Sequence, residues 1–174
     1  WRVLECTHNY NDSLYYADDD PTPRKWEGYD ALAQTRDAQQ YIRQHGKEKP
    51  FALVMSWGPP HDPYQTAPEK YRAMFDPEKL LLRDNVPDDF SKEAREMLAG
   101  YYAHCAVLDE CVGDLLATLD DTGIADNTIF VFTSDHGDLL GSHRQRNKQQ
   151  PYAESIRVPF LIRYPKMLKK TGWK

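Results

Sequence analysis

A stripe of apolar side chains between Met97 and Leu119 constrains the fold more than any other feature of this sequence. Its members recur at steps of three and four residues: Met97, Tyr101, Cys105, Leu108, Val112, Leu115 and Leu119. Such spacing places them on one face of a helix that continues for about six turns. Gly123 then supplies the residue type that most readily adopts a left-handed helix end. The pattern therefore predicts a long helix from about residue 91, with one face buried.

Short apolar runs on both sides of this helix predict strands. Phe51–Trp57, Thr128–Thr133 and Val158–Arg163 are nearly continuous in apolar residues, as strands buried on both faces are. Shorter helices are predicted over residues 26–45 and 68–75. Strands separated by an amphipathic helix are typical of the α/β class, with a mainly parallel sheet flanked by helices. Side chains that follow the carboxyl ends of such strands meet at one edge of the sheet, where binding sites form.

The length of 174 residues suits one domain. Residues 1–25 are polar and interrupted by Pro21 and Pro23, which predicts a loop-rich lead-in, and residues 166–174 are predicted as a tail. The net charge of −5, without a basic stripe, argues against a nucleic-acid partner. No apolar run approaches the ~20 residues that cross a bilayer, so no membrane span is predicted.

Two adjacent residues at the end of one predicted strand are candidate metal ligands. Asp135 and His136 closely follow the run Thr128–Thr133, and Gly137 allows the backbone to turn away. A carboxylate and an imidazole side by side suit ligation of a metal cation. The alternative is that Asp135 caps the following segment while His136 is merely exposed. Asp-His-Gly alone leaves both interpretations open.

His61 and Lys148 are the other candidates. His61 lies in a proline-rich loop after the run Phe51–Trp57. The rigidity of such a loop suits a general acid, which must stay within hydrogen-bond reach of its target. A surface histidine without a role in chemistry is the alternative. Lys148, near Arg144 and Arg146, belongs either to a solvated basic face or to an anion-binding site.

Longer segments surround these candidates. They are Lys49–Tyr64, which ends in Pro-Pro-His-Asp-Pro-Tyr, Asp126–His143, which contains Ser-Asp-His-Gly-Asp, and Lys148–Phe160. Together with the predicted long helix, which carries Tyr101-Tyr102 and Leu108-Asp109, they resemble the sulfatases of the alkaline phosphatase superfamily. The matching segments stand in the family's order and form a core from about residue 26 to 165.

The resemblance implies an alkaline-phosphatase-like fold and hydrolysis of sulfate esters, with a sulfated small molecule or glycan as substrate. It implies that Asp135 and His136 ligate a divalent cation, usually calcium in this family, although many members carry Asn at the second position. It implies that His61 binds the sulfate and protonates the leaving oxygen, and that Lys148 contacts the sulfate and the bridging oxygen. His143, at the end of the Asp126–His143 segment, is taken as a further substrate-binding residue.

The family's nucleophile is missing from this sequence. Sulfatases convert a Cys or Ser in a Cys/Ser-x-Pro/Ala-x-Arg motif to formylglycine, and no Cys or Ser of the chain fits that motif. The family's early paired aspartates lack a match as well, because Asp18-Asp19-Asp20 follows no predicted strand. The resemblance therefore implies an incomplete, single partial catalytic domain, with Trp1 inside a longer protein and the N-terminal part missing. We expect this chain alone to be inactive.

Two alternatives stay open beside a sulfatase. Phosphonate monoester and phosphodiester hydrolases of the same superfamily resemble the chain at the Asp-His-Gly and lysine segments and also use formylglycine. The Pro-His-Asp-Pro loop favours a sulfatase over them. A degenerate, sulfatase-like module without catalysis is the second alternative. The sequence predicts neither the sulfated substrate nor the oligomeric state.

Overall fold

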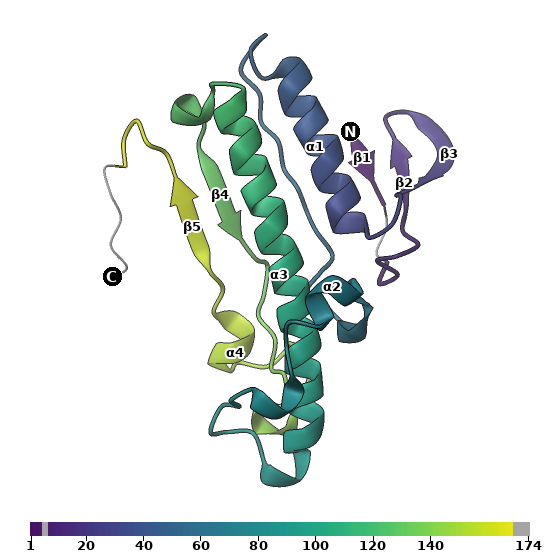
Figure 1. Cartoon of the computed structure of the whole chain (residues 1–174), viewed down its shortest axis with the longest axis vertical. Coiled ribbons are helices and arrows are strands. Elements are labelled where there is room, and N and C mark those ends of the chain that lie inside the picture. Colours follow the sequence, from purple (N-terminus) through teal and green to yellow (C-terminus); the bar gives the residue numbers. More distant parts are fainter. Residues whose placement is uncertain (5–6, 169–174) are drawn as a thin grey trace.

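A computed structural model of the chain describes residues 1–4 and 7–168. Two helices, α1 (Asp30–His45) and α3 (Ser91–Asp121), lie side by side in the middle of the molecule (Figure 1). Gln39 in α1 donates a hydrogen bond of 2.9 Å to the Thr118 hydroxyl in α3. The contact between these two helices buries the core of the molecule.

Helix α3 confirms the prediction from the apolar stripe. It spans Ser91–Asp121, and Gly123 adopts a φ of +72°, in the left-handed region expected after the helix. Met97, Leu108, Leu115 and Leu119 of the stripe are buried, and so are several smaller or polar residues between them. The buried residues of α3 are Ala94, Met97, Ala99, Gly100, Ala103, His104, Val107, Leu108, Cys111, Leu115, Thr118 and Leu119. The buried surface is therefore wider than one stripe, because the helix has neighbours on several sides.

The first 25 residues, predicted as loop, contain a small sheet. Strands β1 (Arg2–Val3), β2 (Leu14–Ala17) and β3 (Asp20–Lys25) pair antiparallel in that order. The prolines of β3 are compatible with this because β3 is an edge strand, where a missing N–H breaks no ladder. The Tyr15 ring stacks on Trp26, with centroids 3.9 Å apart.

The two strands after α3 pair antiparallel, so parallel pairing is not seen within the described residues. In that sheet β4 (Phe130–Thr133) lies against β5 (Phe160–Arg163), with Phe130 opposite Arg163. The connection between them folds back on itself and returns the chain beside β4 (Figure 1). The mixed α/β class is as predicted, and the strand direction is not.

The run Phe51–Trp57 forms no strand in the described structure. Phe51, Met55 and Trp57 pack against the α1–α3 cluster, as Phe130 does, but Val54 is 89% exposed. The apolar residues of this run indicate that it lies against the core, because their burial removes apolar surface from water. They could not predict a hydrogen-bonding partner, since a strand also needs a neighbour.

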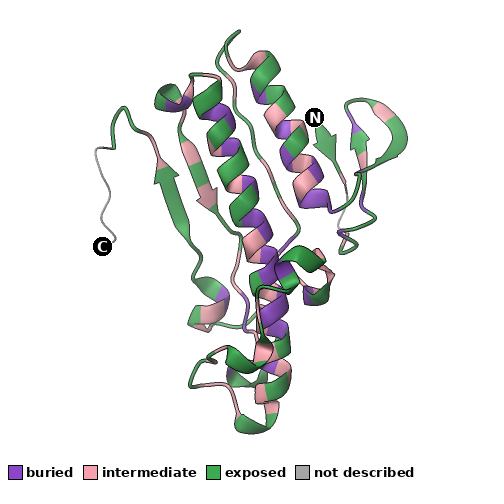
Figure 2. Ribbon diagram, viewed as in Figure 1, coloured by how far each residue is buried: buried purple, intermediate pink, exposed green. Residues whose placement is uncertain are grey.

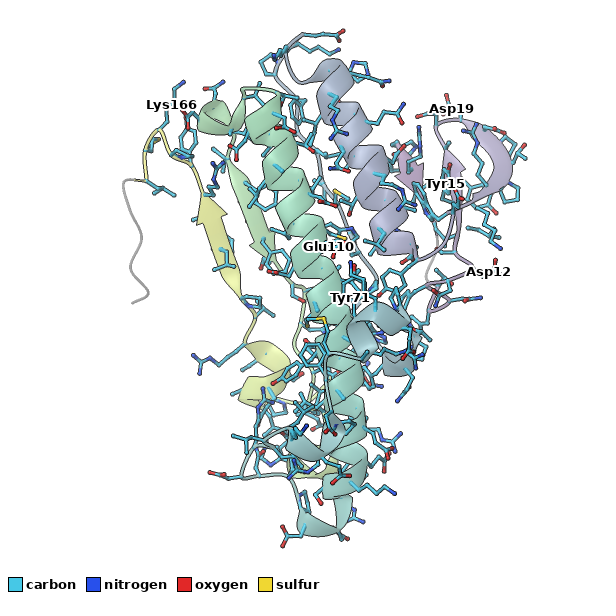
Figure 3. The ribbon with its side chains drawn as sticks, viewed as in Figure 1. Asp12, Tyr15, Asp19, Tyr71, Glu110 and Lys166 are labelled. Carbon is cyan, nitrogen blue, oxygen red and sulfur yellow. The ribbon has the colours of Figure 1, made fainter. Side chains whose placement is uncertain are left out.

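Short helices complete the structure. Helix α2 (Glu69–Arg72) falls inside the predicted helix at 68–75 and is tied to α3 by Lys70, whose ammonium donates to Glu110 at 2.8 Å. Figure 3 shows Tyr71 and Glu110 at this junction. Helix α4 (Ala153–Ile156) precedes β5. Single turns of 3-10 helix lie at Tyr64–Thr66, Pro77–Lys79, Asp88–Phe90, Ala125–Asn127 and Ser142–Arg144.

The sheet of β4 and β5 leaves apolar side chains exposed to solvent. Phe160 is 66% exposed, and Val131, Leu161 and Ile162 are also exposed (Figure 2). Among the described residues, no helix combines the length and apolar character needed to cross a membrane. Residues 169–174, most of the predicted tail, lie outside the described part of the chain.

Candidate active site

A buried tyrosine is hydrogen-bonded to the loop that carries His61. The Tyr10 side chain is fully buried, and its hydroxyl lies 3.0 Å from the His61 carbonyl and 3.2 Å from the Asp62 carbonyl, to which it donates. The loop starts at Gly58, where a Cβ atom would lie only 2.7 Å from the Tyr10 ring. Glycine is required there because the two segments approach so closely.

The imidazole of His61 contacts a charged group at each nitrogen. Nδ1 lies 2.7 Å from an Asp62 carboxylate oxygen, and Nε2 contacts the Nζ atom of Lys148, 87 residues away in the chain. An ammonium group can only donate, so Nε2 accepts from Lys148 and the ring proton resides on Nδ1, where it donates to Asp62. The structure thus brings the two predicted catalytic residues into direct contact.

Lys148 owes its position to an unusual backbone. The residues on either side of it, Asn147 and Gln149, have φ angles of +59° and +75°, in the left-handed region that side chains rarely adopt. Asparagine is the non-glycine residue that tolerates this conformation best. Asn147 is held there by its carbonyl, which accepts from the Leu139 N–H at 2.8 Å.

Asp135 and His136 lie just beyond the end of β4. The Asp135 side chain is 84% exposed, and its Oδ1 accepts from the His136 N–H at 3.0 Å. His136 donates from Nδ1 to the Gly137 carbonyl at 2.7 Å, which leaves Nε2 with a free lone pair. At Gly137 a Cβ atom would lie 2.0 Å from the Glu154 carbonyl, so the chain turns where only glycine fits.

These two residues fit part of a divalent-cation site. Asp135 Oδ2 and His136 Nε2 are 3.6 Å apart. Two ligands at right angles, each about 2.4 Å from one cation, would lie about 3.4 Å apart. A slight loss of hydration raises the pKa of Asp135, but the neighbouring imidazole of His136 and hydrogen bonds to the carboxylate outweigh it, so the pKa is lowered and the ligand form is favoured. No group of three or more potential ligands gathers within the described ranges.

The pair Asp135 and His136, the candidate cation ligands, lies beside the pair His61 and Lys148. The rings of His61 and His136 have centroids 6.1 Å apart and meet edge to face at 73°. Side chains that follow the predicted strands were expected to meet at one edge of a sheet. His61 and His136 do meet, with Lys148 in contact with His61, although the run Phe51–Trp57 forms no strand.

One tyrosine hydroxyl joins the loops of this site. Tyr64 Oη donates to an Asp138 carboxylate oxygen at 2.7 Å and lies 3.2 Å from the Asn147 amide oxygen. Burial raises the pKa of Asp138, and burial together with Asp138 raises the pKa of Tyr64. Each partner stands within three residues of a candidate site residue. We call this set, Tyr64, Asp138 and Asn147, the Tyr64 junction.

His143 lies in a separate cluster. Its ring stacks on Tyr152 with centroids 3.8 Å apart, and its Nε2 lies 3.1 Å from the Asn85 side-chain amide. Glu154 completes the group, 3.9 Å from the same nitrogen. No contact of His143 with His61 or Lys148 is found in the described part of the chain, so the predicted substrate-binding residue is not brought to them.

Sequence analysis missed several residues that touch the site. His8 stacks on His61 with ring centroids 4.5 Å apart, and Asp62 and the Tyr64 junction hold the loops. Asp62 and Tyr64 belong to the Pro-His-Asp-Pro-Tyr segment, so their neighbour offered a signal. His8 offered none, because it lies in the segment predicted as loop.

Comparisons with known proteins identify the family of this chain. The family model "Sulfatase" matches residues 5–173. An ulvan-active sulfatase of Formosa agariphila is 45% identical over 175 residues, which cover 99% of this chain and 34% of the relative. An endo-4-O-sulfatase of Bacteroides thetaiotaomicron is 31% identical over 154 residues, 82% of this chain and 29% of the relative.

Solved structures with a similar fold include a sulfatase and a phosphonate monoester hydrolase. YidJ of Bacteroides fragilis, assigned as a sulfatase, superposes with a TM-score of 0.90 at 30% identity, over 97% of this chain and 38% of that chain. A phosphonate monoester hydrolase of Agrobacterium radiobacter superposes with a TM-score of 0.65 at 26% identity, over 76% and 33%. The chain spans about a third of the length of the curated relatives named above. On the match of the family model and these relatives, the chain belongs to the sulfatase family.

Proposed function

We propose that this chain supplies the acid–base residues and part of the cation site of an enzyme that hydrolyses sulfate esters. The contact between His61 and Lys148, next to the Asp135–His136 pair, is the observation that supports it most strongly. Two cationic or protonatable side chains beside two cation ligands form a site suited to an oxyanion group with an ester oxygen to protonate.

His61 and Lys148 both assist the departure of the ester oxygen. When the bond between sulfur and the ester oxygen breaks, the oxygen leaves with negative charge and needs a proton. In the structure Lys148 donates a hydrogen bond to Nε2 of His61. When Lys148 turns to the sulfate oxygens, Nε2 takes a proton from solvent and passes it to the leaving oxygen, and Asp62 at Nδ1 stabilises the ring while it is charged. The ammonium of Lys148 also offsets charge on the sulfate oxygens.

Asp135 and His136 would hold a divalent cation, which the family resemblance suggests to be calcium. When bound, the cation offsets negative charge on the sulfate group. The remaining ligands and the formylglycine nucleophile would come from a part of the protein outside this chain. We therefore propose that the chain by itself turns over no sulfate ester.

The substrate we propose is a sulfated glycan. The relatives include a sulfatase named as ulvan-active and an endo-4-O-sulfatase, and both names indicate carbohydrate sulfates. The similarity to a phosphonate monoester hydrolase keeps that activity as the second candidate. Parallel assays of the full-length protein with matched aryl sulfates and aryl phosphonates separate the two.

The proposed acid role of His61 is tested in the full-length protein. His61→Ala should slow sulfate esters with poor leaving groups by about 10²–10⁴-fold, because general acid catalysis is worth that much, and should slow activated phenol esters far less. kcat/KM across a series of leaving groups measures this. His45→Ala is the matched control, since His45 ends α1, is half-buried and pairs with Glu48 just beyond the helix at 3.0 Å. Equal losses across the series would contradict the role.

A further inference from the structure

The imidazole of His8 covers one face of the imidazole of His61. The two ring centroids are 4.5 Å apart and the ring planes differ by 22°, which is a stacked arrangement. His8 is exposed, while the side chain of His61 is only 19% exposed to solvent. A residue far from His61 in sequence therefore forms part of the wall of the candidate site.

The segment that carries His8 is fastened to the His61 loop at several points. The Tyr10 hydroxyl donates to the His61 and Asp62 carbonyls, and the Asn11 amide donates to the Thr66 carbonyl at 2.9 Å. The Tyr10 carbonyl in turn accepts from the first N–H of α1, at Asp30. Tyr10 and Asn11, two and three residues after His8, are thus fixed relative to the His61 loop.

We infer that His8 is a positioning residue, which holds the ring of His61 in the orientation needed to protonate a leaving group. The inference rests on the proposed function. Two contacts in the ring plane, at Asp62 and Lys148, leave the ring able to tilt, and a stacked neighbour opposes that tilt. Substrate would draw Lys148 toward its sulfate oxygens. Asp62 in the ring plane, the edge-on ring of His136 and the stacked ring of His8 would then remain, and of these three His8 is the one stacked on the ring face.

The experiment uses the full-length protein with three variants. His8→Ala removes the stack, His8→Phe keeps a flat ring without polar atoms, and Asn9→Ala is the control in the neighbouring exposed residue. We expect His8→Ala to lower kcat/KM by roughly 10–100-fold for poor leaving groups, because small displacements of a catalytic group are this costly. Activated esters should lose less than threefold, by the same reasoning. His8→Phe should restore most of the loss, and Asn9→Ala should resemble the parent.

Several outcomes overturn the inference. Equal losses in His8→Ala and His8→Phe would make His8 a polar contact of the substrate instead. Equal losses across leaving groups, or none, would remove His8 from the reaction. A crystal structure of His8→Ala decides the stack without any activity, since a His61 ring that keeps its place refutes positioning. A parent that hydrolyses no sulfate ester overturns the proposed function alone, and the variant structure still decides the inference.

Discussion

At the scale of single residues, the hydroxyl of Tyr64 does more to shape the site than its position in the sequence suggests. It lies between the Asp138 carboxylate, two residues after His136, and the Asn147 amide, one residue before Lys148. Its own backbone continues the loop of His61. Three stretches of chain that each carry a site residue therefore meet at one buried oxygen atom, and the distances among His61, Lys148 and His136 depend on it.

Tyr64→Phe should loosen this arrangement without emptying the core. The change leaves the buried Asp138 carboxylate short of a donor, which costs about 1–3 kcal/mol of unfolding free energy. In the full-length protein we expect kcat/KM to fall about tenfold or more, because the catalytic groups lose their fixed spacing. Thermal unfolding and steady-state kinetics measure the two effects.

Tyr102→Phe is the control for that variant. Tyr102 lies in α3 and is 39% exposed, so its hydroxyl is free to bond with water. It should leave both stability and rate near the parent values. A Tyr64→Phe enzyme with unchanged kinetics would show that the Tyr64 junction does not position the site.

At the scale of elements, α3 is the support on which the His61 loop rests. At Gly100 a Cβ atom would lie 2.4 Å from the Tyr64 carbonyl, so the loop presses directly on the helix backbone. One turn further, His104 is fully buried, with Nε2 donating to the Pro63 carbonyl at 3.3 Å and Nδ1 accepting from the Tyr29 hydroxyl. The helix thus joins the start of α1 to the candidate site through one neutral imidazole.

This imidazole should make folding sensitive to acid. Burial lowers the pKa of His104 from 6.5 to about 4. Between those values the unfolded chain binds a proton that the folded chain does not, so stability is fully present above pH 6.5 and declines as the pH falls toward 4. The shift corresponds to a loss on the order of 3 kcal/mol.

The measurement compares unfolding of the chain with that of His104→Gln between pH 4 and 7. The difference between the two curves is the quantity needed, because Asp30 acts oppositely in the same range. Burial raises the pKa of Asp30 from 3.8 to about 6, so its ionisation lowers stability as the pH rises. A difference that stays constant with pH would show that His104 is not a buried neutral base.

How far the sequence predicts each element depends on what holds that element in place. Helix α3 was predictable because its own spacing of apolar residues sets both its conformation and its buried face. The run Phe51–Trp57 and the strands β1–β3 were not, because strand pairing depends on neighbours that no local pattern encodes. Asp135, His136, His61 and Lys148 were candidates from their places in the sequence, and the family resemblance supplied their roles. His8 needed the stack to be seen.

At the scale of the whole molecule, the sheet of β4 and β5 leaves apolar side chains exposed on both of its faces, since successive residues of a strand point to opposite sides. Phe160, Leu161 and Ile162 are successive residues of β5, and all are exposed (Figure 2). An exposed apolar surface of this kind is a site of association. In this chain it lies on the sheet whose strand β4 leads into the candidate cation pair.

We expect the isolated chain to self-associate through this sheet. Sedimentation velocity should show concentration-dependent oligomers, and the double variant Phe160→Lys, Ile162→Lys should abolish them, since these residues share one face of β5. Leu81→Lys is the control, because Leu81 is 90% exposed and lies outside the sheet. Oligomers that persist in the double variant would place the contact elsewhere.

The left-handed residues that flank Lys148 also bear on how this protein can vary. Asn147 and Gln149 occupy a conformation in which branched side chains clash with their own backbone. Directed evolution at these two positions should therefore return asparagine, aspartate and glycine, and reject valine, isoleucine and threonine whatever substrate is used for selection. Variation on either side of the lysine would then report the geometry of the main chain, and a library meant to alter substrate preference would do better to leave both positions untouched.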